Sequence, residues 1–173
     1  MKPTAVNTGL IMGTTSVVFT VLCYILGPWA FGSMWLLLAM TIVSLTGFFY
    51  FAIQARKMNG GYFTYAEAYK FCIVVTAVWV PIMIFSKYLF ILIDLPFFEQ
   101  VNELMVEDQI TRFEAFGMPE AQINVAVAEV EKSYAESLTP IGQVKALAWM
   151  FFGFAIVDLL FALFIRKKRP EFA

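Results

Sequence analysis

Asp158 is the residue whose type and place most suggest chemistry, because its carboxyl group lies within a long apolar run near the end of the chain. A charge at the centre of a bilayer costs at least about 2.5–3.5 kcal/mol, so such an acid should be protonated or have a partner. Lys70 lies at a comparable depth when residues are counted inward from Tyr65. Glu67, one turn before Lys70, and Asn7 near the first apolar run complete a candidate buried polar cluster.

This cluster has two interpretations. If Asp158 and Lys70 pass protons or bind an ion, the protein is a small transporter or an ion-conducting oligomer. If they form a buried pair, the pair fixes how two helices meet. A four-helix protein with a single buried acid more often uses that acid structurally, and the sequence shows no broken-helix pair or inverted repeat of the kind transporters use. We therefore adopt the structural interpretation and keep transport as the alternative.

Gly9 and Gly13 form a GxxxG motif, and Ser16 and Thr20 continue the small residues near the same face. Small residues allow the backbones of two helices to approach closely. The motif therefore indicates either a homodimer interface, and so a homo-oligomer, or helix packing within one bundle. Because GxxxG is a common pattern, we adopt packing within the bundle.

Composition limits other catalytic and metal-binding chemistry. The sequence has no histidine, which excludes histidine-ligated haem, histidine-based zinc sites and histidine acid–base catalysis. Cys23 and Cys72 lie in apolar runs, as buried thiols do, and form no CxxC motif. Carboxylate pairs such as Glu103 and Glu107 lack the spacing of a calcium-binding loop. We therefore predict that the protein is not an enzyme and holds no cofactor or metal.

The elements that position these residues are membrane-spanning helices. Hydrophobic residues make up 61% of the sequence and charged residues 14%, against about 45–50% and 25% in soluble proteins. A soluble domain of 173 residues cannot bury so much apolar surface, whereas a bilayer accepts it. A hydrocarbon core of about 30 Å needs about 20 helical residues. Four runs meet this requirement, at residues 6–26, 33–53, 65–95 and 140–165.

Local signals mark where several of these helices begin and end. Thr64 and Glu67 have the spacing of a capping box at the start of the third helix. Pro81 lies in the middle of that helix and predicts a bend. Thr139 followed by Pro140 is typical of an N-cap and first helical residue, and predicts the start of the fourth helix.

The insert at residues 96–139 has a different character from the apolar runs. Residues 94–139 hold ten acidic and two basic residues. Gly117 and Pro119 divide this region in two. Apolar residues recur on both sides at helical spacing: Phe97, Phe98, Val101, Leu104 and Met105 before the division, and Ile123, Val127, Val130 and Tyr134 after it. This periodicity predicts an amphipathic helical hairpin outside the bilayer.

The distribution of Lys and Arg predicts the orientation in the membrane. Eight of these residues fall on one side of the predicted helices, namely Lys2, Arg56, Lys57, Lys70 and residues 166–169. Lys87, Arg112, Lys132 and Lys145 fall on or towards the other side. The side with eight is predicted to be the cytoplasm, so both termini are cytoplasmic and the acidic insert is extracytoplasmic.

Two segments also resemble a known family. Residues 2–9, KPTAVNTG, and residues 59–70, NGGYFTYAEAYK, after Arg56, are similar to a bacterial membrane-protein family catalogued as domain of unknown function 4199. The resemblance extends over essentially the whole chain. It implies a location in the bacterial inner membrane and assigns no activity to any residue.

The sequence thus predicts an all-α protein, a single membrane domain over residues 1–173, in which an extracytoplasmic helical hairpin interrupts a four-helix transmembrane bundle. The predicted function is that of a non-enzymatic accessory or interaction protein. Its partners are the lipid bilayer and a protein at the acidic insert, and no nucleic acid.

Overall fold

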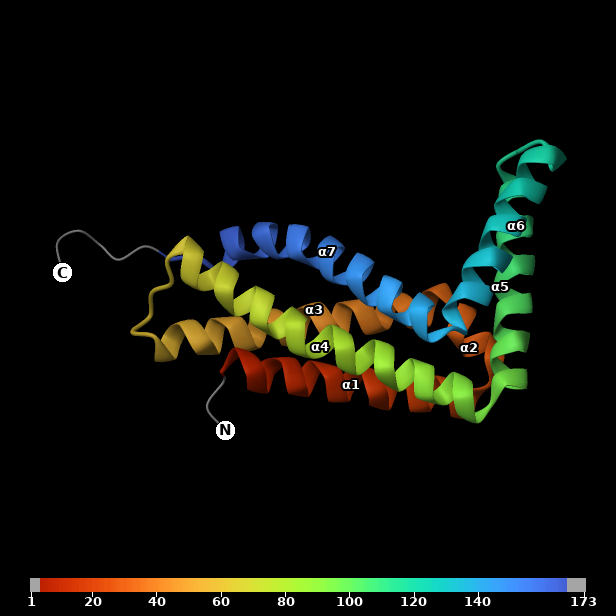
Figure 1. Cartoon of the computed structure of the whole chain (residues 1–173). Helices are drawn as coiled ribbons and strands as arrows, with labels where there is room; N and C mark the ends of the chain where they lie inside the picture. Colours follow the sequence, from red (N-terminus) through yellow and green to blue (C-terminus); the bar gives the residue numbers. More distant parts are fainter. Residues whose placement is uncertain (1–3, 168–173) are drawn as a thin grey trace.

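The computed structural model describes residues 4–167, and its architecture is helical throughout this range (Figure 1). Lys2, Lys168 and Arg169, which contributed to the predicted orientation, lie outside the described residues. Seven helices follow one another in the described part: α1 (Ala5–Leu26), α2 (Pro28–Gly32), α3 (Met34–Met58), α4 (Tyr65–Ile93), α5 (Leu95–Ala115), α6 (Glu120–Ser137) and α7 (Pro140–Ile165).

Four of these helices, α1, α3, α4 and α7, are long and apolar enough to cross a membrane. The prediction of an all-α membrane protein with four spans is therefore confirmed. The main difference from the prediction lies between the first two spans, where the short helix α2 begins at Pro28. A single residue, Gly27, separates it from the end of α1. In addition, α3 continues five residues beyond the predicted end at Ile53 and carries Arg56 and Lys57 in its last turn.

The capping box predicted at the start of α4 is present. The Thr64 hydroxyl accepts a hydrogen bond from the backbone N–H of Glu67 (3.3 Å), and the Glu67 carboxylate accepts one from the backbone N–H of Thr64 (2.8 Å). These two bonds satisfy donors that the first turn of a helix otherwise leaves free. At the other end α4 stops at Ile93, where Asp94 becomes the N-cap of α5.

The bundle is built around α4, which packs closely against α1 on one side and α7 on the other, whereas α3 makes fewer contacts. Gly9 and Gly13 of α1 face α4. A Cβ atom on Gly9 would lie 2.7 Å from the Val78 Cβ atom, and one on Gly13 would lie 2.8 Å from the Ile82 Cδ1 atom. The structure thus places the GxxxG motif in the interface between α1 and α4 of the same chain.

Helices α5 and α6 form an arm that leaves the bundle at a steep angle, at the end opposite to the loop between α3 and α4 (Figure 1). The two helices lie side by side and contact each other. On α6, Ile123 is buried and Val127, Val130 and Tyr134 are half-buried.

The apolar stripe predicted on α5 is only partly present. Phe98 and Val101 are buried, but Leu104 and Met105 are about 40% exposed. The stripe is incomplete because α5 contacts two helices, α2 and α6. Its apolar residues are therefore divided between two faces.

Candidate functional site

Asp158 lies on α7 near the middle of the bundle, and its side chain is 2% exposed. Its Oδ2 atom accepts a hydrogen bond of 2.9 Å from the Thr76 hydroxyl of α4. Among the residues that the structure describes, this is the one hydrogen bond of the carboxyl group. A buried acid therefore meets a neutral donor at the interface of α4 and α7.

The predicted pairing of Asp158 with Lys70 is wrong, because Lys70 is exposed. Lys70 precedes Thr76 by six residues, which is about 9 Å along a helix. Lys70 was chosen by counting residues inward from the ends of the two helices. These ends do meet, since Phe63, just before α4, exchanges two backbone hydrogen bonds with Lys167, just after α7, at 3.0 and 2.8 Å. Equal counting does not give the contact, however, because the Asp158 carboxyl group meets Thr76, which lies further along α4 than Lys70.

Glu67 and Asn7 also lie away from Asp158. Glu67 is exposed and caps α4, and it lines a surface hollow that it shares with Lys70 and Thr4. Asn7 is half-buried in the first turn of α1, where its backbone N–H donates to the Thr4 hydroxyl (3.2 Å). The four residues of the predicted cluster thus divide into one buried acid and a group near the opposite end of the bundle from the arm.

A cavity of about 420 Å³ lies beside Asp158, lined by residues of α1, α3, α4 and α7 and partly open at its surface. Its volume is within the range of small-molecule sites, about 300–1,000 Å³. Five aromatic side chains contribute to its wall, namely Phe19, Phe48, Trp79, Phe154 and Phe161. The cavity is therefore largely apolar and has one buried acid in its wall.

The packing of α3 explains why this space exists. The buried residues of α3, Phe48, Ala52 and Ala55, all lie in its second half. The first half contributes Leu37 and Met40 to the cavity wall and is not buried against the bundle. Because α3 is packed tightly only towards its end, the four helices do not close on each other along their whole length.

Several polar groups on the wall are hydrogen-bonded to one another or to backbone carbonyls. The Ser16 hydroxyl accepts a bond of 2.8 Å from the indole N–H of Trp79 and donates one of 3.1 Å to the Met12 carbonyl. The hydroxyls of Thr20 and Thr41 donate to carbonyl oxygens four residues earlier in their own helices. These bonds satisfy the donors and leave oxygen lone pairs in the wall.

Asp94 forms the joint between α4 and the arm. Its carboxylate accepts a hydrogen bond of 2.7 Å from the hydroxyl of Tyr24 and one of 3.2 Å from the backbone N–H of Phe97. Aromatic rings pack around this joint: the Tyr24 ring centroid is 4.6 Å from that of Phe97, and the Phe31 centroid is 5.5 Å from that of Phe98. A capped helix start and an aromatic cluster thus fix the base of α5.

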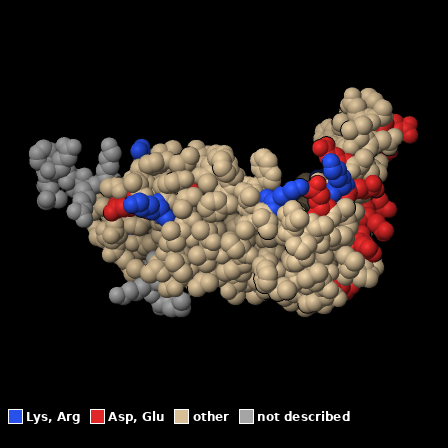
Figure 2. All heavy atoms as spheres, viewed as in Figure 1, with Lys and Arg blue, Asp and Glu red and all other residues tan. Residues whose placement is uncertain are grey.

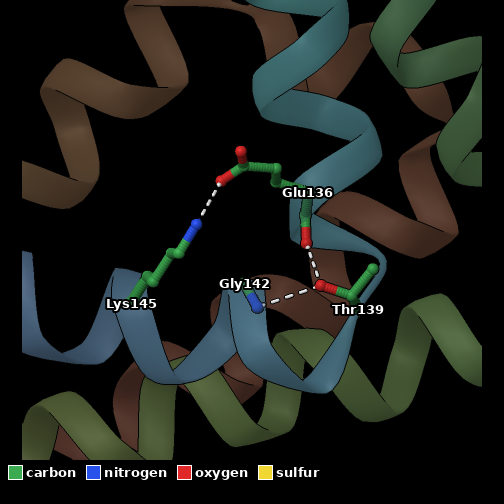
Figure 3. A network of polar contacts seen from close by, with 4 residues as sticks. All are labelled: Glu136, Thr139, Gly142 and Lys145. Atoms are coloured by element: carbon green, nitrogen blue, oxygen red, sulfur yellow. Dashed lines mark hydrogen bonds and ion pairs between the residues drawn. The ribbon is translucent and has the colours of Figure 1, made fainter.

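A second joint connects α6 to α7 (Figure 3). The Thr139 hydroxyl accepts from the backbone N–H of Gly142 (3.0 Å) and donates to the backbone carbonyl of Glu136 (2.8 Å). Lys145 approaches the Glu136 carboxylate at 3.2 Å. A Cβ atom on Gly142 would collide with the Glu136 carbonyl oxygen. The arm is therefore held at both ends.

Acidic side chains gather on the arm (Figure 2). Glu99, Glu103, Glu107 and Glu114 are all exposed, and their spacing places them on one face of α5. The helical spacing places Arg112 on another face of α5, where it pairs with Asp108 at 2.6 Å. The tip of the arm carries Phe116, which is 83% exposed. The arm thus presents an acidic face that ends in an exposed aromatic ring.

Tyr134 places a polar group, its hydroxyl, inside the arm. Its hydroxyl is buried and has no hydrogen-bond partner in the described part of the chain. Burial, and secondly the Glu99 carboxylate, raise the pKa of the Tyr134 phenol above its usual value of 10.0. An unpartnered buried hydroxyl costs free energy, so this position is a weak point of the arm.

Neither Thr76 nor the cavity was predicted from the sequence. Thr76 lies within an apolar run, and a single hydroxyl there carries no signal that it faces an acid on another helix. Within residues 4–167, no group of three His, Cys, Asp or Glu side chains is placed to hold a metal ion.

Comparison with known proteins identifies a family. A family model described as "Protein of unknown function (DUF4199)" matches residues 7–167, so the chain belongs to this family, as the resemblance predicted. No curated protein and no solved structure matches the chain.

Proposed function

We propose that this member of the DUF4199 family is a non-enzymatic accessory protein of the bacterial inner membrane, whose arm of α5 and α6 binds a partner protein with a basic surface. The observation that carries the proposal is the exposed row of Glu99, Glu103, Glu107 and Glu114 on α5. No reaction is proposed, and the proposal concerns binding alone.

The acidic row is unfavourable for the arm itself. Like charges four residues apart destabilise a helix by about 0.2–0.5 kcal/mol per pair, and Glu99, Glu103 and Glu107 form two such pairs. A basic partner would offset this repulsion and would be attracted by the net charge of about −8 over residues 94–139.

Phe116 supplies the apolar part of the proposed interface. Protein interfaces commonly combine an aromatic residue that enters a pocket of the partner with a surrounding polar rim. Phe116 is 83% exposed at the tip of an arm that both joints hold in place. A held arm loses less conformational entropy on binding than a flexible loop would.

The proposed orientation places the arm outside the cytoplasm. Arg56, Lys57, Lys70 and Lys167 all lie near the end of the bundle where α3 ends and α4 begins, and the arm leaves the opposite end (Figure 1). An excess of Lys and Arg marks the cytoplasmic side of membrane proteins. The alternative function, transport through Asp158 and Lys70, loses support because Lys70 is exposed and Asp158 is hydrogen-bonded to Thr76 instead.

The test is crosslinking from the tip of the arm in native membranes. A photo-reactive phenylalanine at position 116 should give one discrete adduct with another protein. Neutralising two carboxylates of the acidic row with Glu103→Gln and Glu107→Gln should lower the yield of this adduct severalfold, and so should added salt. The matched control, Glu129→Gln with Glu131→Gln, removes the same charge from α6 and should leave the yield unchanged.

A second control places the photo-reactive residue at Trp35, which is 80% exposed on the membrane helix α3. The proposal fails if the adduct from position 116 is equally abundant after the stripe is neutralised. It also fails if position 35 gives the same adduct in the same amount.

A further inference from the structure

We infer that the cavity beside Asp158 is a binding site for a lipophilic organic cation, an ammonium ion that carries an apolar body. This inference concerns the membrane helices and does not depend on the partner proposed for the arm. It rests on four properties of the cavity: the buried carboxyl group, the surrounding acceptors, the aromatic wall and the loosely packed half of α3.

The carboxyl group of Asp158 lines the cavity, and one of its two oxygen atoms has no hydrogen-bond partner within residues 4–167. Asp158 is 98% buried, and the Thr76 hydroxyl occupies its Oδ2 atom at 2.9 Å. Within residues 4–167 its Oδ1 atom has no hydrogen-bond partner, and Asp158 lines the cavity. In the part of the chain that the structure describes, no Lys or Arg lines the cavity, so a cation from outside the chain would meet no competing charge from these residues.

The other polar atoms select the same type of ligand. The Trp79 indole N–H is engaged by Ser16, and the hydroxyl hydrogens of Ser16, Thr20 and Thr41 are engaged by backbone carbonyls. These groups therefore offer oxygen lone pairs to the cavity. Within residues 4–167 the hydroxyl of Ser44, which also lines the cavity, has no hydrogen-bond partner and can turn its oxygen or its hydrogen to a ligand. A ligand that accepts hydrogen bonds gains this one donor, whereas a cation is attracted to all of these oxygens.

The aromatic residues add to this preference. Phe19, Phe48, Trp79, Phe154 and Phe161 surround a space that also contains Asp158. Two of these rings, Trp79 and Phe154, have centroids 5.4 Å apart, and Phe48 and Phe161 have centroids 5.3 Å apart. Aromatic faces attract ammonium groups, and rings grouped with a carboxylate are a recurring way to bind quaternary ammonium ions.

Size and access are consistent with a ligand that dissolves in the bilayer. The volume of about 420 Å³ accommodates a molecule with one ring and a short alkyl chain. The first half of α3, which contributes Leu37, Met40 and Thr41 to the wall, is not buried against the other helices. A lipophilic cation in the membrane could therefore reach the cavity beside α3 without crossing a packed core.

The test measures binding of 4-phenylbutyl-trimethylammonium to the full chain in nanodiscs of zwitterionic lipid by titration calorimetry. Empty nanodiscs provide the background for partition into lipid. We expect saturable binding with one site per chain. The neutral isostere, in which carbon replaces the nitrogen, should bind about tenfold more weakly or not at all, because it has the same shape without the charge.

Two variants locate the site. Asp158→Asn keeps the size of the side chain and should weaken binding of the cation about tenfold or more. Ser44→Phe fills the cavity from α3 and should abolish saturable binding while the helical content and thermal stability are kept. Glu129→Gln, which removes an exposed acid from α6, should bind the cation as the unmodified chain does.

Three results would overturn the inference: binding to protein-containing discs that does not exceed binding to empty ones, equal affinity for the cation and its neutral isostere, or unchanged affinity in both Asp158→Asn and Ser44→Phe. If Asp158→Asn fails to fold, Ser44→Phe and the isostere decide the matter. None of these results depends on whether the arm binds a partner.

Discussion

Thr76 and Asp158 are joined by a hydrogen bond of 2.9 Å that connects α4 to α7 within the bundle. The donor is a neutral hydroxyl and not the cationic side chain of Lys70, although the sequence suggested Lys70. This bond is the most direct polar link between the two helices at this depth, and its contribution to stability can be measured.

Thr76→Val should lower the free energy of unfolding in detergent by about 1–3 kcal/mol, because it removes the donor and leaves a buried acceptor unsatisfied. Combined with Asp158→Asn, it should show a non-additive loss in a double-mutant cycle. Lys70→Met is the matched control and should change stability by less than about 0.5 kcal/mol, as surface substitutions do. A large loss for Lys70→Met, with additive losses for Thr76→Val and Asp158→Asn, would contradict this assignment.

Gly9→Ala should destabilise the bundle by about 1–3 kcal/mol, the usual range for overpacking. The added Cβ atom would lie 2.7 Å from the Val78 Cβ atom and 2.9 Å from the Val75 carbonyl oxygen, and neither atom can move without its helix. Gly13→Ala should also destabilise the bundle, because its Cβ atom would lie 2.8 Å from the Cδ1 atom, 2.9 Å from the Cγ2 atom and 3.0 Å from the Cβ atom of Ile82.

Gly153→Ala is the control for these substitutions, since nothing lies within 4 Å of a Cβ atom there. It should be neutral or stabilising by up to about 1 kcal/mol, because alanine favours a helix more than glycine does. Thermal unfolding in one detergent compares all three variants. Equal changes in thermal stability for Gly9→Ala and Gly153→Ala would show that α1 does not pack against α4 as closely as in the structure.

Replacing both Val127 and Val130 by Asp should separate α6 from α5 while the membrane helices stay inserted. Both valines are half-buried on the face of α6 that also carries the buried Ile123. Val125→Asp is the matched control, because Val125 is 68% exposed on the same helix. Hydrogen exchange over residues 97–116 should accelerate in the double variant alone. Fast exchange throughout the arm of the unmodified protein would show that α5 and α6 are not stably packed.

Single cysteines at Asn59 and Glu120 should label from opposite faces of sealed cells, with Glu120 accessible from outside. Both positions are exposed, one after α3 and the other at the start of α6. Cys23 and Cys72 are buried and should give little background. Labelling of both introduced cysteines from the same face would contradict the four-span arrangement.

Tyr134→Phe should leave stability at neutral pH unchanged or raise it by up to about 1 kcal/mol, because it removes a buried hydroxyl that has no partner. The raised pKa of Tyr134 also gives a pH dependence. Above pH 10 the unfolded chain releases this proton before the folded chain does, so rising pH destabilises the folded protein.

The difference in unfolding free energy between the variant and the unmodified chain should therefore be constant below about pH 10 and should grow in favour of the variant above it. Tyr50→Phe, at a position that is 57% exposed on α3, controls for loss of a phenol. A difference that does not change with pH would show that Tyr134 titrates alike in both states.

Helix ends were the most predictable part of the fold, because local chemistry sets them. Each of the two predicted helix starts depends on residues no more than three positions apart. Thr64 with Glu67 caps α4, and Thr139 with Pro140 begins α7, as predicted. The long apolar runs were likewise predicted as membrane spans, and each forms a helix long and apolar enough to cross a membrane. The short helix α2 was not predicted, although Pro28 suits a first helical position.

The candidate site was less predictable, because it depends on how helices slide against each other. Asp158 was recognised from its place in an apolar run, but its partner Thr76 depends on how α4 and α7 pack side by side, which counting residues from the helix ends does not give. The cavity arises from the incomplete packing of the first half of α3, and the regular apolar pattern of that helix gives no indication of it.

The two backbone hydrogen bonds between Phe63 and Lys167 have a consequence for the biogenesis of the protein. The guanidinium of Arg56, before the same loop, donates a further bond of 3.0 Å to the Ile165 carbonyl, from which it is 109 residues distant in the chain. During synthesis, α1, α3 and α4 leave the ribosome long before these acceptors exist. The loop between α3 and α4 must therefore wait in water, with its amide groups hydrated, until α7 has entered the membrane. Closure of this junction would then mark the completion of co-translational assembly.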